Sequence, residues 1–269
     1  MMMIGRRLPR NSGFKPNSEV MILRRFFTEP ENINENTAVI LEDAAHIKKV
    51  LRMNPGDEIL IFDGSGREYT ARLSEIGSDR CLAEIISAEM SKQEPTVKVT
   101  VFQAVPKSGK MEGIIQKAVE LGVTGIVPVA ADRCVSKLDG GKREAEKLKR
   151  WNKVAVEAAK QCGRGILPSV EPCIGFKAAI ERMKESGLAL MPYEMLGHDG
   201  VSNLKDILDK SDSADISIII GPEGGFSDSE VDYALKSGIA MVGLGHRILR
   251  TETVSSMMLS IIMYAKNSL

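Results

Sequence analysis

Cysteine and histidine are scarce in this chain, and the few that are present do not cluster. The 269 residues include four cysteines and three histidines. The cysteines are Cys81, Cys134, Cys162 and Cys173. Their spacing excludes a C-x-x-C redox pair and a zinc knuckle, and no histidine stands near them in the sequence. The sequence therefore predicts no metal site, and it predicts buried or unreactive thiols in a reducing compartment.

Net charge and long apolar runs are also missing. Basic and acidic residues number 36 each, so a nucleic-acid partner would have to be held by local basic patches and not by a global field. No apolar run approaches the ~20 residues that span a bilayer, and no hydrophobic stretch follows the arginines near the N-terminus. The sequence therefore predicts no membrane segment, no secretory signal, a flexible extension over residues 1–22 and a cytoplasmic location.

Short strand-like segments fill residues 23–90. Strands are expected at residues 38–41, 58–62, 69–73 and 81–86. The turn Asp63-Gly-Ser-Gly66 indicates a hairpin between the second and third of them. One helix is expected at residues 43–53, with Ile47 and Val50 on its buried face. Several short strands and one helix predict a small β-barrel.

After a polar linker at residues 90–95, strands and helices alternate to the C-terminus. Strands are expected at residues 97–101, 126–130, 188–191, 216–220 and 240–244. Helices are expected from Met111 to Gly122, from Leu148 to Gly163, from Ser227 to Gly238 and from about Glu252 onwards. This alternation predicts an α/β fold with a mostly parallel sheet covered by helices.

Two glycine-containing loops follow apolar strands near the C-terminus. The segment Ile218–Phe226 changes from a β-branched run to Gly-Pro-Glu-Gly-Gly, and Leu244–Thr253 repeats this change further along the chain. A buried strand that ends in such a turn brings its backbone to a ligand at its carboxyl end. Glycine also occupies tight turns for purely structural reasons, so the first loop alone leaves both interpretations open.

Charged residues on these loops favour a ligand site. Glu223 lies in the first loop, and Arg250 and Glu252 lie in the second. A helix capped at Thr251 would explain Glu252 through the helix dipole. It would not explain Arg250 between apolar turns, where burial of an arginine is costly unless the side chain meets an anion or a polar substrate. The sequence therefore predicts one pocket with charged groups at its rim.

Two other segments resemble nucleotide-binding loops only in part. Ser108-Gly-Lys110 lacks the preceding glycine and the following Ser or Thr of a phosphate-binding loop, so a basic loop that opens a helix fits it better. Gly243-Leu-Gly245 begins like a dinucleotide fingerprint, but Ile248 occupies the position of the third glycine. Neither nucleotide-triphosphate nor nicotinamide or flavin binding is therefore expected.

A series of ordered motifs covers nearly the whole chain from Leu23. The motifs are Arg24-Arg-Phe-Phe27, His46 to Arg52, Phe62-Asp-Gly64, Lys110-Met-Glu112, Gln116 to Val123, Arg133, Gln161-Cys-Gly-Arg164, Gly221 to Gly225 and Leu244 to Thr253. In this order they resemble the RsmE-type 16S ribosomal RNA uracil-N3 methyltransferases of the SPOUT (α/β-knot) class. The resemblance implies a PUA-like RNA-binding β-barrel at residues 23–90 and, at residues 96–269, a SPOUT α/β domain with a trefoil knot.

The resemblance also implies the ligand and the partners. S-Adenosylmethionine would be the methyl donor, N3 of a uridine in 16S ribosomal RNA of the small subunit would be the acceptor, and the protein would be a homodimer with no metal and no membrane partner. Two rival functions remain open. One is a SPOUT methyltransferase that acts on a ribose 2′-hydroxyl or on tRNA, and the other is a non-catalytic RNA-binding assembly factor.

Site residues follow from the same resemblance. Those expected to contact the cofactor are Leu190, Met191, Pro192, Tyr193, Gly221, Pro222, Glu223, Gly224, Gly225, Leu244, Gly245, Ile248, Leu249, Arg250 and Thr253. Uracil N3 must lose a proton before it attacks, so Arg250 is expected to stabilise the anionic ring, and Glu223 and Glu252 remain competing candidates for the base. Residues expected to contact RNA are Arg24, Arg25, Lys48, Lys49, Arg52, Lys107, Lys110 and Arg133.

Overall fold

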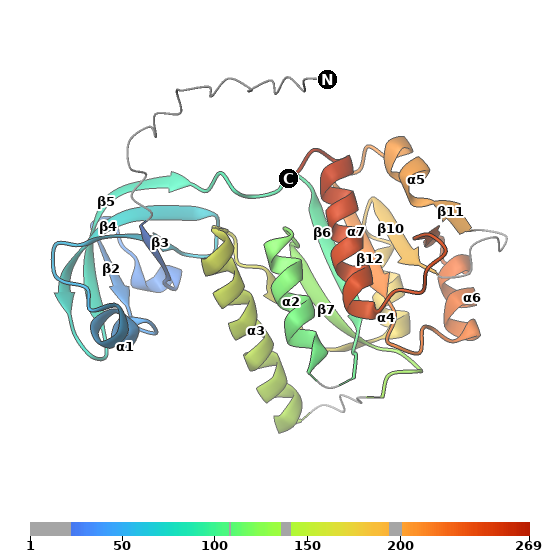
Figure 1. The fold of residues 1–269 in the computed structure, drawn as a ribbon, viewed down its shortest axis with the longest axis horizontal. Coiled ribbons are helices and arrows are strands. Elements are labelled where there is room, and N and C mark those ends of the chain that lie inside the picture. Colours follow the sequence, from blue (N-terminus) through green and yellow to red (C-terminus); the bar gives the residue numbers. More distant parts are fainter. Residues whose placement is uncertain (1–22, 108, 136–140, 194–200) are drawn as a thin grey trace, which may run out of the picture.

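The computed structural model of this protein describes residues 23–107, 109–135, 141–193 and 201–269, which form two β-sheets, one in each half of the chain (Figure 1). The extension predicted for residues 1–22 lies outside the described residues. Within the described ranges, no helix has both the length and the apolar character needed to cross a membrane. The same ranges bring no three His, Cys, Asp or Glu side chains together as a group that could hold a metal ion.

The first sheet has five strands in the order β1-β3-β4-β5-β2. They are β1 (Arg24–Phe27), β2 (Thr37–Ile40), β3 (Glu58–Phe62), β4 (Arg67–Ile76) and β5 (Cys81–Met90), and a short 3-10 helix, η1 (Pro30–Asn32), precedes β2. Strands β3 and β4 pair antiparallel and confirm the predicted hairpin. Strands β1 and β2 form the two edges, so the predicted barrel is a curled half-barrel (Figure 1).

The helix predicted at residues 43–53 is shorter and changes character along its length. One α-helical turn, α1 (Ala44–His46), continues into a π-helical turn, η2 (Ile47–Leu51), which ends at Arg52 with a left-handed φ of 51°. Val50 is 66% exposed, so its predicted place on the buried face is wrong. A π turn rotates each residue by a smaller angle than an α turn does, and this difference moves Val50 away from the core.

The second sheet is parallel throughout, which confirms the predicted fold class. Its order is β11-β13-β10-β12-β6-β7-β8, and β9 also pairs with β7. The strands are β6 (Lys98–Ala104), β7 (Gly125–Ala130), β8 (Ser169–Val170), β9 (Ile174–Gly175), β10 (Leu188–Pro192), β11 (Val201–Asn203), β12 (Asp215–Ile220) and β13 (Ala240–Gly243). The trefoil knot and the domain boundaries at residues 22, 90 and 96 stay predictions.

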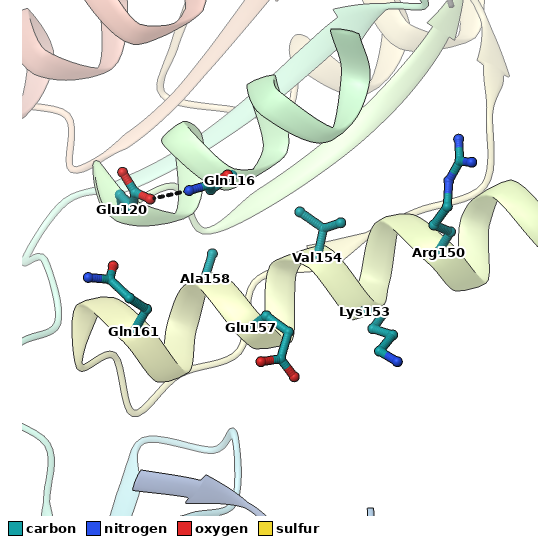
Figure 2. A pocket seen from close by; sticks show the side chains of 8 residues that line it. All are labelled: Gln116, Glu120, Arg150, Lys153, Val154, Glu157, Ala158 and Gln161. Carbon is teal, nitrogen blue, oxygen red and sulfur yellow. Dashed lines mark hydrogen bonds between the residues drawn. The ribbon is translucent and has the colours of Figure 1, made fainter. Parts of the chain in front are cut away.

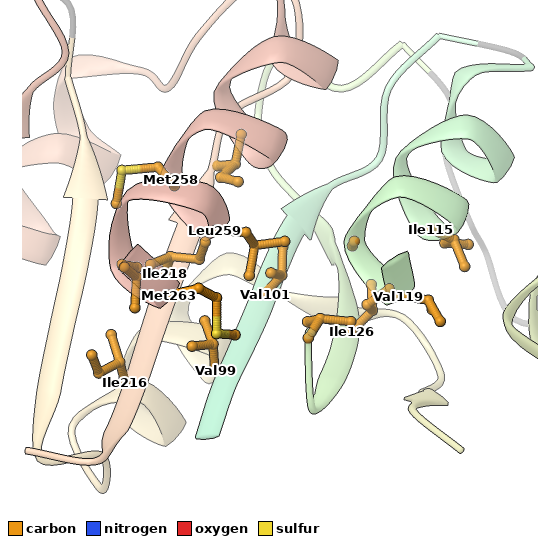
Figure 3. Packing of buried hydrophobic residues seen from close by; sticks show 14 of the residues in the cluster. Val99, Val101, Ile115, Val119, Ile126, Ile216, Ile218, Met258, Leu259 and Met263 are labelled. Carbon is orange, nitrogen blue, oxygen red and sulfur yellow. The ribbon is translucent and has the colours of Figure 1, made fainter. Parts of the chain in front are cut away.

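Helices cover both faces of this sheet. They are α2 (Lys110–Glu120), α3 (Lys142–Cys162), α4 (Phe176–Met183), α5 (Leu204–Lys210), α6 (Asp228–Lys236) and α7 (Thr251–Ala265). Side chains of α2, α3, α5 and α7 share one core layer, and those of α4 and α6 share the other. Because successive strand residues point to opposite faces, Ile218 belongs to the first layer and Ile219 to the second. Figure 3 shows the first layer, with Ile218 beneath Leu259 of α7.

A buried ion pair joins the two halves of the chain. Arg164, in the turn after α3, is 4% exposed, and its Nη2 lies 2.8 Å from Oε2 of Glu94 in the linker. The other Glu94 oxygen accepts the backbone N–H groups of Gly165 and Ile166, each at 2.9 Å. Nη1 of Arg164 donates to the carbonyl oxygen of Val123, at the end of the α2 turn. These contacts therefore fix the linker to the second half of the chain.

Arg25 takes part in the contacts around Arg164 and does not form part of a free basic surface. Its Nη2 donates to the carbonyl oxygen of Arg164 at 3.0 Å and pairs with Glu68 at 3.1 Å. The guanidinium lies 5.2 Å from the centroid of the Phe62 ring, and the side chain is only 15% exposed. The prediction that Arg25 contacts RNA phosphates is therefore wrong, because Glu68 neutralises its charge and the protein covers it.

We expect Arg164→Met to lower the free energy of unfolding by about 3 kcal/mol, because the change leaves Glu94 as a largely buried carboxylate without its cation. Urea unfolding followed by circular dichroism measures this loss. The matched control is Arg72→Met, since Arg72 pairs with Glu58 at 2.9 Å but its side chain is 52% exposed. That variant should lose at most about 1 kcal/mol. Equal losses of unfolding free energy in the two variants would contradict a special contribution of the Arg164–Glu94 pair to stability.

Candidate active site

The carboxyl ends of the central parallel strands meet at one edge of the second sheet. Following the spatial order β13-β10-β12-β6-β7, the loops after these strands begin at Leu244, Tyr193, Gly221, Val105 and Ala131. Open α/β sheets bind ligands in the crevice outside the carboxyl ends of their strands. The fold therefore brings loops that are far apart in the sequence to the place where such sheets carry their sites.

The loop Gly221–Gly225 and the start of α7 are joined by hydrogen bonds. Thr251 Oγ1 donates to the carbonyl oxygen of Gly221 at 2.7 Å and accepts Nε2 of Gln103 at 3.0 Å. Gln103 is completely buried on β6, and its Nε2 also donates to the carbonyl oxygen of Ala104. These bonds tie the ends of β6, β12 and α7 together, so the two glycine-containing loops are neighbours.

Lys110 contacts both carboxylates that compete for the role of base. Its Nζ lies 3.0 Å from Oε1 of Glu223 and 3.4 Å from Oε2 of Glu252. Both oxygens of Glu223 also accept the backbone N–H of Lys107, at 3.3 and 3.2 Å. Across the part of the chain that the structure describes, the Glu252 carboxylate has no ion pair other than the one with Lys110. Lys110 therefore shares its charge between two carboxylates, and its predicted contact with RNA stays a prediction.

The Lys110–Glu223 pair is charged at neutral pH. A hydrogen bond to Glu223 raises the pKa of Lys110 above its ordinary value of 10.5. Burial acts to raise the pKa of Glu223, but hydrogen bonds from Lys110 and from the backbone of Lys107 outweigh it and hold this pKa below 4.5. A lowered pKa makes a carboxylate a weaker proton acceptor. Glu223, which both Lys107 and Lys110 hold, is thus suited to anchoring its loop, whereas the described contacts of the Glu252 carboxylate include Lys110 as its ion-pair partner.

Arg250 is exposed at the N-terminus of α7. Its carbonyl oxygen accepts the N–H groups of Thr253 and Val254, at 2.8 and 3.0 Å, so its backbone begins the helix. Its guanidinium makes no hydrogen bond or ion pair within the described ranges. The turn before it projects from the end of β13, and Ile248 on this turn is 85% exposed. The arginine is therefore free to meet a substrate.

The predicted cofactor loop at Leu190–Tyr193 is largely a strand. β10 continues through Pro192, and the side chains of Leu190 and Met191 are completely buried in the two core layers. The loop therefore begins only at Tyr193, whose backbone N–H donates to the carbonyl oxygen of Val242 at 2.9 Å. Any contact of Leu190 and Met191 with a ligand would use their main-chain atoms, and the predicted contacts stay a prediction.

A hollow of about 470 Å³ lies beside the second glycine-containing loop. Its wall consists of Ser202, Asn203, Leu204, Lys205, Gly243, Leu244, Gly245, His246, Met257 and Ile261. Gly245 has a φ of +99°, and a Cβ placed there would meet no atom within 4 Å, so its backbone borders open space. Of the predicted cofactor residues, Leu244 and Gly245 line this hollow, and all the others, including the Gly221–Gly225 loop and Arg250, lie outside its wall.

The predicted RNA-binding residues fall into two groups. Arg24, Lys48, Lys49 and Arg52 are exposed on the first sheet and its helical turn. Apart from Arg25, the others are Lys107, Lys110 and Arg133 at the carboxyl edge of the second sheet, where Nη1 of Arg133 donates to the carbonyl oxygen of Gly224 at 3.0 Å. Arg133 therefore supports the Gly221–Gly225 loop with one of its donors.

The four cysteines are free thiols. Burial raises the pKa of each of them, and that of Cys173 reaches about 11. A thiol that stays protonated at neutral pH is a poor nucleophile and a poor metal ligand. The described geometry thus leaves the carboxylates and cations at the sheet edge as the chemically active groups.

Two family models match this chain. An RNA methyltransferase domain matches residues 92–263, and an RNA methyltransferase PUA domain matches residues 42–86. The first match includes the whole carboxyl edge described above. The second match lies within the curled first sheet and its helical turn.

Curated relatives and solved structures agree with these models. The chain is 34% identical over 250 residues to ribosomal RNA small subunit methyltransferase E of Bacillus subtilis, covering 90% of this chain and 96% of the relative. It is 36% identical over 236 residues to the protein of that name from Mesomycoplasma hyopneumoniae, covering 88% and 97%. The structure resembles that of the Neisseria gonorrhoeae enzyme of the same name bound to S-adenosylmethionine, with a TM-score of 0.80, 33% identity and coverage of 90% and 97%.

Proposed function

This chain belongs to the RNA methyltransferase family whose members are named ribosomal RNA small subunit methyltransferase E. From that membership we propose that it methylates N3 of a uridine in 16S ribosomal RNA, with S-adenosylmethionine as the methyl donor. The observation that carries the proposal is the junction at the carboxyl edge of the second sheet. There Thr251 binds the Gly221 carbonyl, and Lys110 bridges Glu223 and Glu252. The Glu252 carboxylate, the Arg250 guanidinium (unpaired within the described residues) and the solvent-accessible backbone at Gly245 thus lie on the loop after β13 and the start of α7.

The residues at this edge fit the cofactor. The hollow of about 470 Å³ lies within the size range of small-molecule sites, and the backbone at Gly245 borders open space. Leu244 and Gly245 would hold S-adenosylmethionine at this hollow, and main-chain groups of Tyr193 and Gly221–Gly225, which lie outside its wall, would contact the cofactor from the neighbouring strand ends. When bound, the cofactor supplies a methyl group that is already activated on a sulfonium, so the protein's tasks are positioning and removal of a proton.

Each charged residue at the edge then has a separate role. Glu252 accepts the proton of uracil N3, and Arg250 stabilises the negative charge that the ring acquires. Lys110 positions Glu252 and, through Glu223, fixes the first glycine-containing loop. Because N3 lies on the pairing edge of the base, the target uridine must be unpaired and turned out of any helix.

The first sheet supplies contacts with the RNA backbone in this proposal. Arg24, Lys48, Lys49 and Arg52 are exposed cations there, and cations of this kind contact phosphates without reading the sequence. We also propose that the enzyme is a homodimer, that it is cytoplasmic and that its second half carries a trefoil knot. These three properties rest on the family resemblance.

The experiment that tests the proposal is methylation of purified, unmodified small ribosomal subunits, followed by digestion and mass spectrometry of the nucleosides. We expect 3-methyluridine, with a mass and retention time distinct from those of 2′-O-methyluridine. A 2′-O-methylated product, or methylation of tRNA instead, would replace the proposed acceptor. Failure to bind S-adenosylmethionine in calorimetry would favour a non-catalytic assembly factor.

The hydrogen bond between Thr251 and Gly221 gives a separate prediction. Thr251→Val keeps the shape of the side chain but removes the hydroxyl, which leaves the Gly221 carbonyl and the buried Gln103 amide without this partner. We expect the free energy of unfolding to fall by about 1–3 kcal/mol. The affinity for S-adenosylmethionine should fall as well, because the two loops are no longer tied together.

The matched control for this prediction is Thr251→Ser, which keeps the hydroxyl. Urea unfolding and isothermal titration calorimetry of the three proteins measure both quantities. The serine variant should resemble the parent protein in both. A serine variant as impaired as the valine variant would show that the methyl group, and not the hydrogen bond, is what matters at this position.

A further inference from the structure

Helix α3 carries a concentration of positive charge that the active site does not use. Its 21 residues include seven basic and three acidic side chains, a net charge of +4, whereas the whole chain has a formal net charge of +0. Its buried side chains are Trp151, Ala155, Ala158 and Ala159. The charges therefore lie on the flanks and the outer face of the helix.

Most of these cations have no partner inside the protein. Lys160 pairs with Asp43 and Glu157, and Arg150 pairs with Glu112. Within the ranges that the structure describes, five others make no hydrogen bond or ion pair: Lys142, Arg143, Lys147, Lys149 and Lys153. Isolated surface charges are common, but these five cations fall on twelve residues of one helix in which Glu144 and Glu146 are the acidic residues, so the segment carries an excess of positive charge.

Three of these lysines form a line. Lys142, Lys149 and Lys153 are exposed and follow one another at intervals of seven and four residues, so they share one face of the helix. At a rise of ~1.5 Å per residue, Lys149 lies about 10 Å and Lys153 about 16 Å beyond Lys142 along the axis. The line is thus long enough to contact several successive phosphates of one strand.

The helix connects the two parts of the molecule that an RNA substrate would contact. It follows β7 and runs back along the sheet, so it begins at the carboxyl edge, where the candidate active site lies. Its last turn lies beside the first sheet, where Nζ of Lys160 is 2.7 Å from Oδ2 of Asp43. Figure 1 shows α3 between the first sheet and α2. A strand that reaches from the first sheet to the active site therefore passes along this helix.

A hollow of about 420 Å³ between α2 and α3 borders the line (Figure 2). Its wall contains Arg150 and Lys153, but also Glu120 and Glu157, so the hollow itself does not suit a phosphate. The outer face has a net positive charge, because Lys142, Lys149 and Lys153 outnumber Glu146, which is exposed between the first two of them. A second copy of this chain is a poor occupant, since a symmetric contact would place lysines against lysines.

We infer that Lys142, Lys149 and Lys153 form a phosphate-binding surface that guides ribosomal RNA from the first sheet to the active site. The inference rests on the proposed function, because it requires an RNA substrate. Each lysine that contacts a phosphate releases counterions, so this surface makes binding depend on salt without reading the base sequence.

The test compares two triple variants of the full chain. The first is Lys142→Gln, Lys149→Gln and Lys153→Gln, which removes three charges and keeps residues that favour helix. The control is Lys98→Gln, Lys210→Gln and Lys236→Gln, which removes the same charge from the start of β6 and the ends of α5 and α6, at the amino end of the sheet. Binding to protein-free small-subunit rRNA and to small ribosomal subunits is measured from low to high salt, and methylation is measured at increasing subunit concentration.

The first variant should lower the slope of log affinity against log salt by about 2, since each lost phosphate contact with a single strand removes roughly 0.7. Its KM for small subunits should rise, while kcat and the affinity for S-adenosylmethionine stay unchanged. The control variant should match the parent protein. If the two variants behave alike, the proposal that these lysines bind phosphates is overturned. It is also overturned if the first variant binds subunits more weakly but binds free rRNA as the parent protein does, because the partner would then be a ribosomal protein. If the parent protein neither binds nor methylates rRNA, the proposed function fails, and the surface fails with it.

Discussion

Methyl transfer is expected to slow by about 10²–10⁴-fold when Glu252 is replaced by Gln, because the variant keeps the shape of the side chain but cannot accept a proton. Glu252 lies in the first turn of α7 and meets Lys110 at 3.4 Å. Loss of its charge weakens the favourable interaction with the helix dipole by only about 0.3–1 kcal/mol, so the fold should persist. Single-turnover rates at saturating cofactor and small subunits measure the effect.

Glu223→Gln is the matched comparison for this prediction. Glu223 has a lowered pKa and is held by Lys110 and by the backbone of Lys107, so its role is to fix the loop. We expect this variant to bind S-adenosylmethionine more weakly and, at saturating cofactor, to lose less than about tenfold in rate, well below the loss expected for a base. A large rate loss in Glu223→Gln together with a small one in Glu252→Gln would exchange the two roles.

Replacement of Arg250 by Ala is expected to lower kcat by about 10²–10³-fold, the usual effect of removing a group that stabilises charge in the transition state. The hydrogen bonds that begin α7 use the backbone carbonyl of Arg250, and they remain in the variant. The guanidinium is exposed and unpaired within the described ranges, so its loss should leave the free energy of unfolding nearly unchanged. The measurements are methyl transfer to small subunits, cofactor affinity and urea unfolding.

Arg250→Lys separates charge from geometry. A lysine keeps the positive charge but lacks the planar set of donors that can bind two oxygens together. We expect it to recover only part of the lost rate. Unchanged turnover in Arg250→Ala would remove this residue from the mechanism, and a parallel loss of stability would assign it to the fold instead.

The regular elements of the second half were predictable because their patterns are local. Val99 and Val101 alternate along β6, and Ile115 and Ala118 follow at helical spacing along α2, as the core layers confirm. Helix α4 has the same kind of pattern in Phe176, Ala179, Ile180 and Met183, which are all buried, yet it was not predicted. That pattern could have been recognised from the spacing alone.

The side-chain contacts that the sequence did not predict share one cause, which is that the partner is distant in the sequence. Arg25 is neutralised by Glu68, 43 residues away, and Lys110 contacts Glu223 across more than a hundred residues. No local pattern contains these pairs. Gln103 did leave a sign, because an amide in the apolar strand β6 has to find a hydrogen-bond partner once buried, although its partner Thr251 lies 148 residues further on.

The sequence by itself determined the elements, the parallel α/β class and the two glycine-containing loops, because periodicity and turn residues act over a few positions. Its ordered motifs also indicated the family. Only the tertiary structure decided which charges meet: it placed Lys110 between Glu223 and Glu252, left Arg250 exposed and brought the cations of α3 to the surface between the two sheets. The physical reason is that parallel strands deliver distant loops to one edge, where electrostatic partners are set by proximity in space and not along the chain.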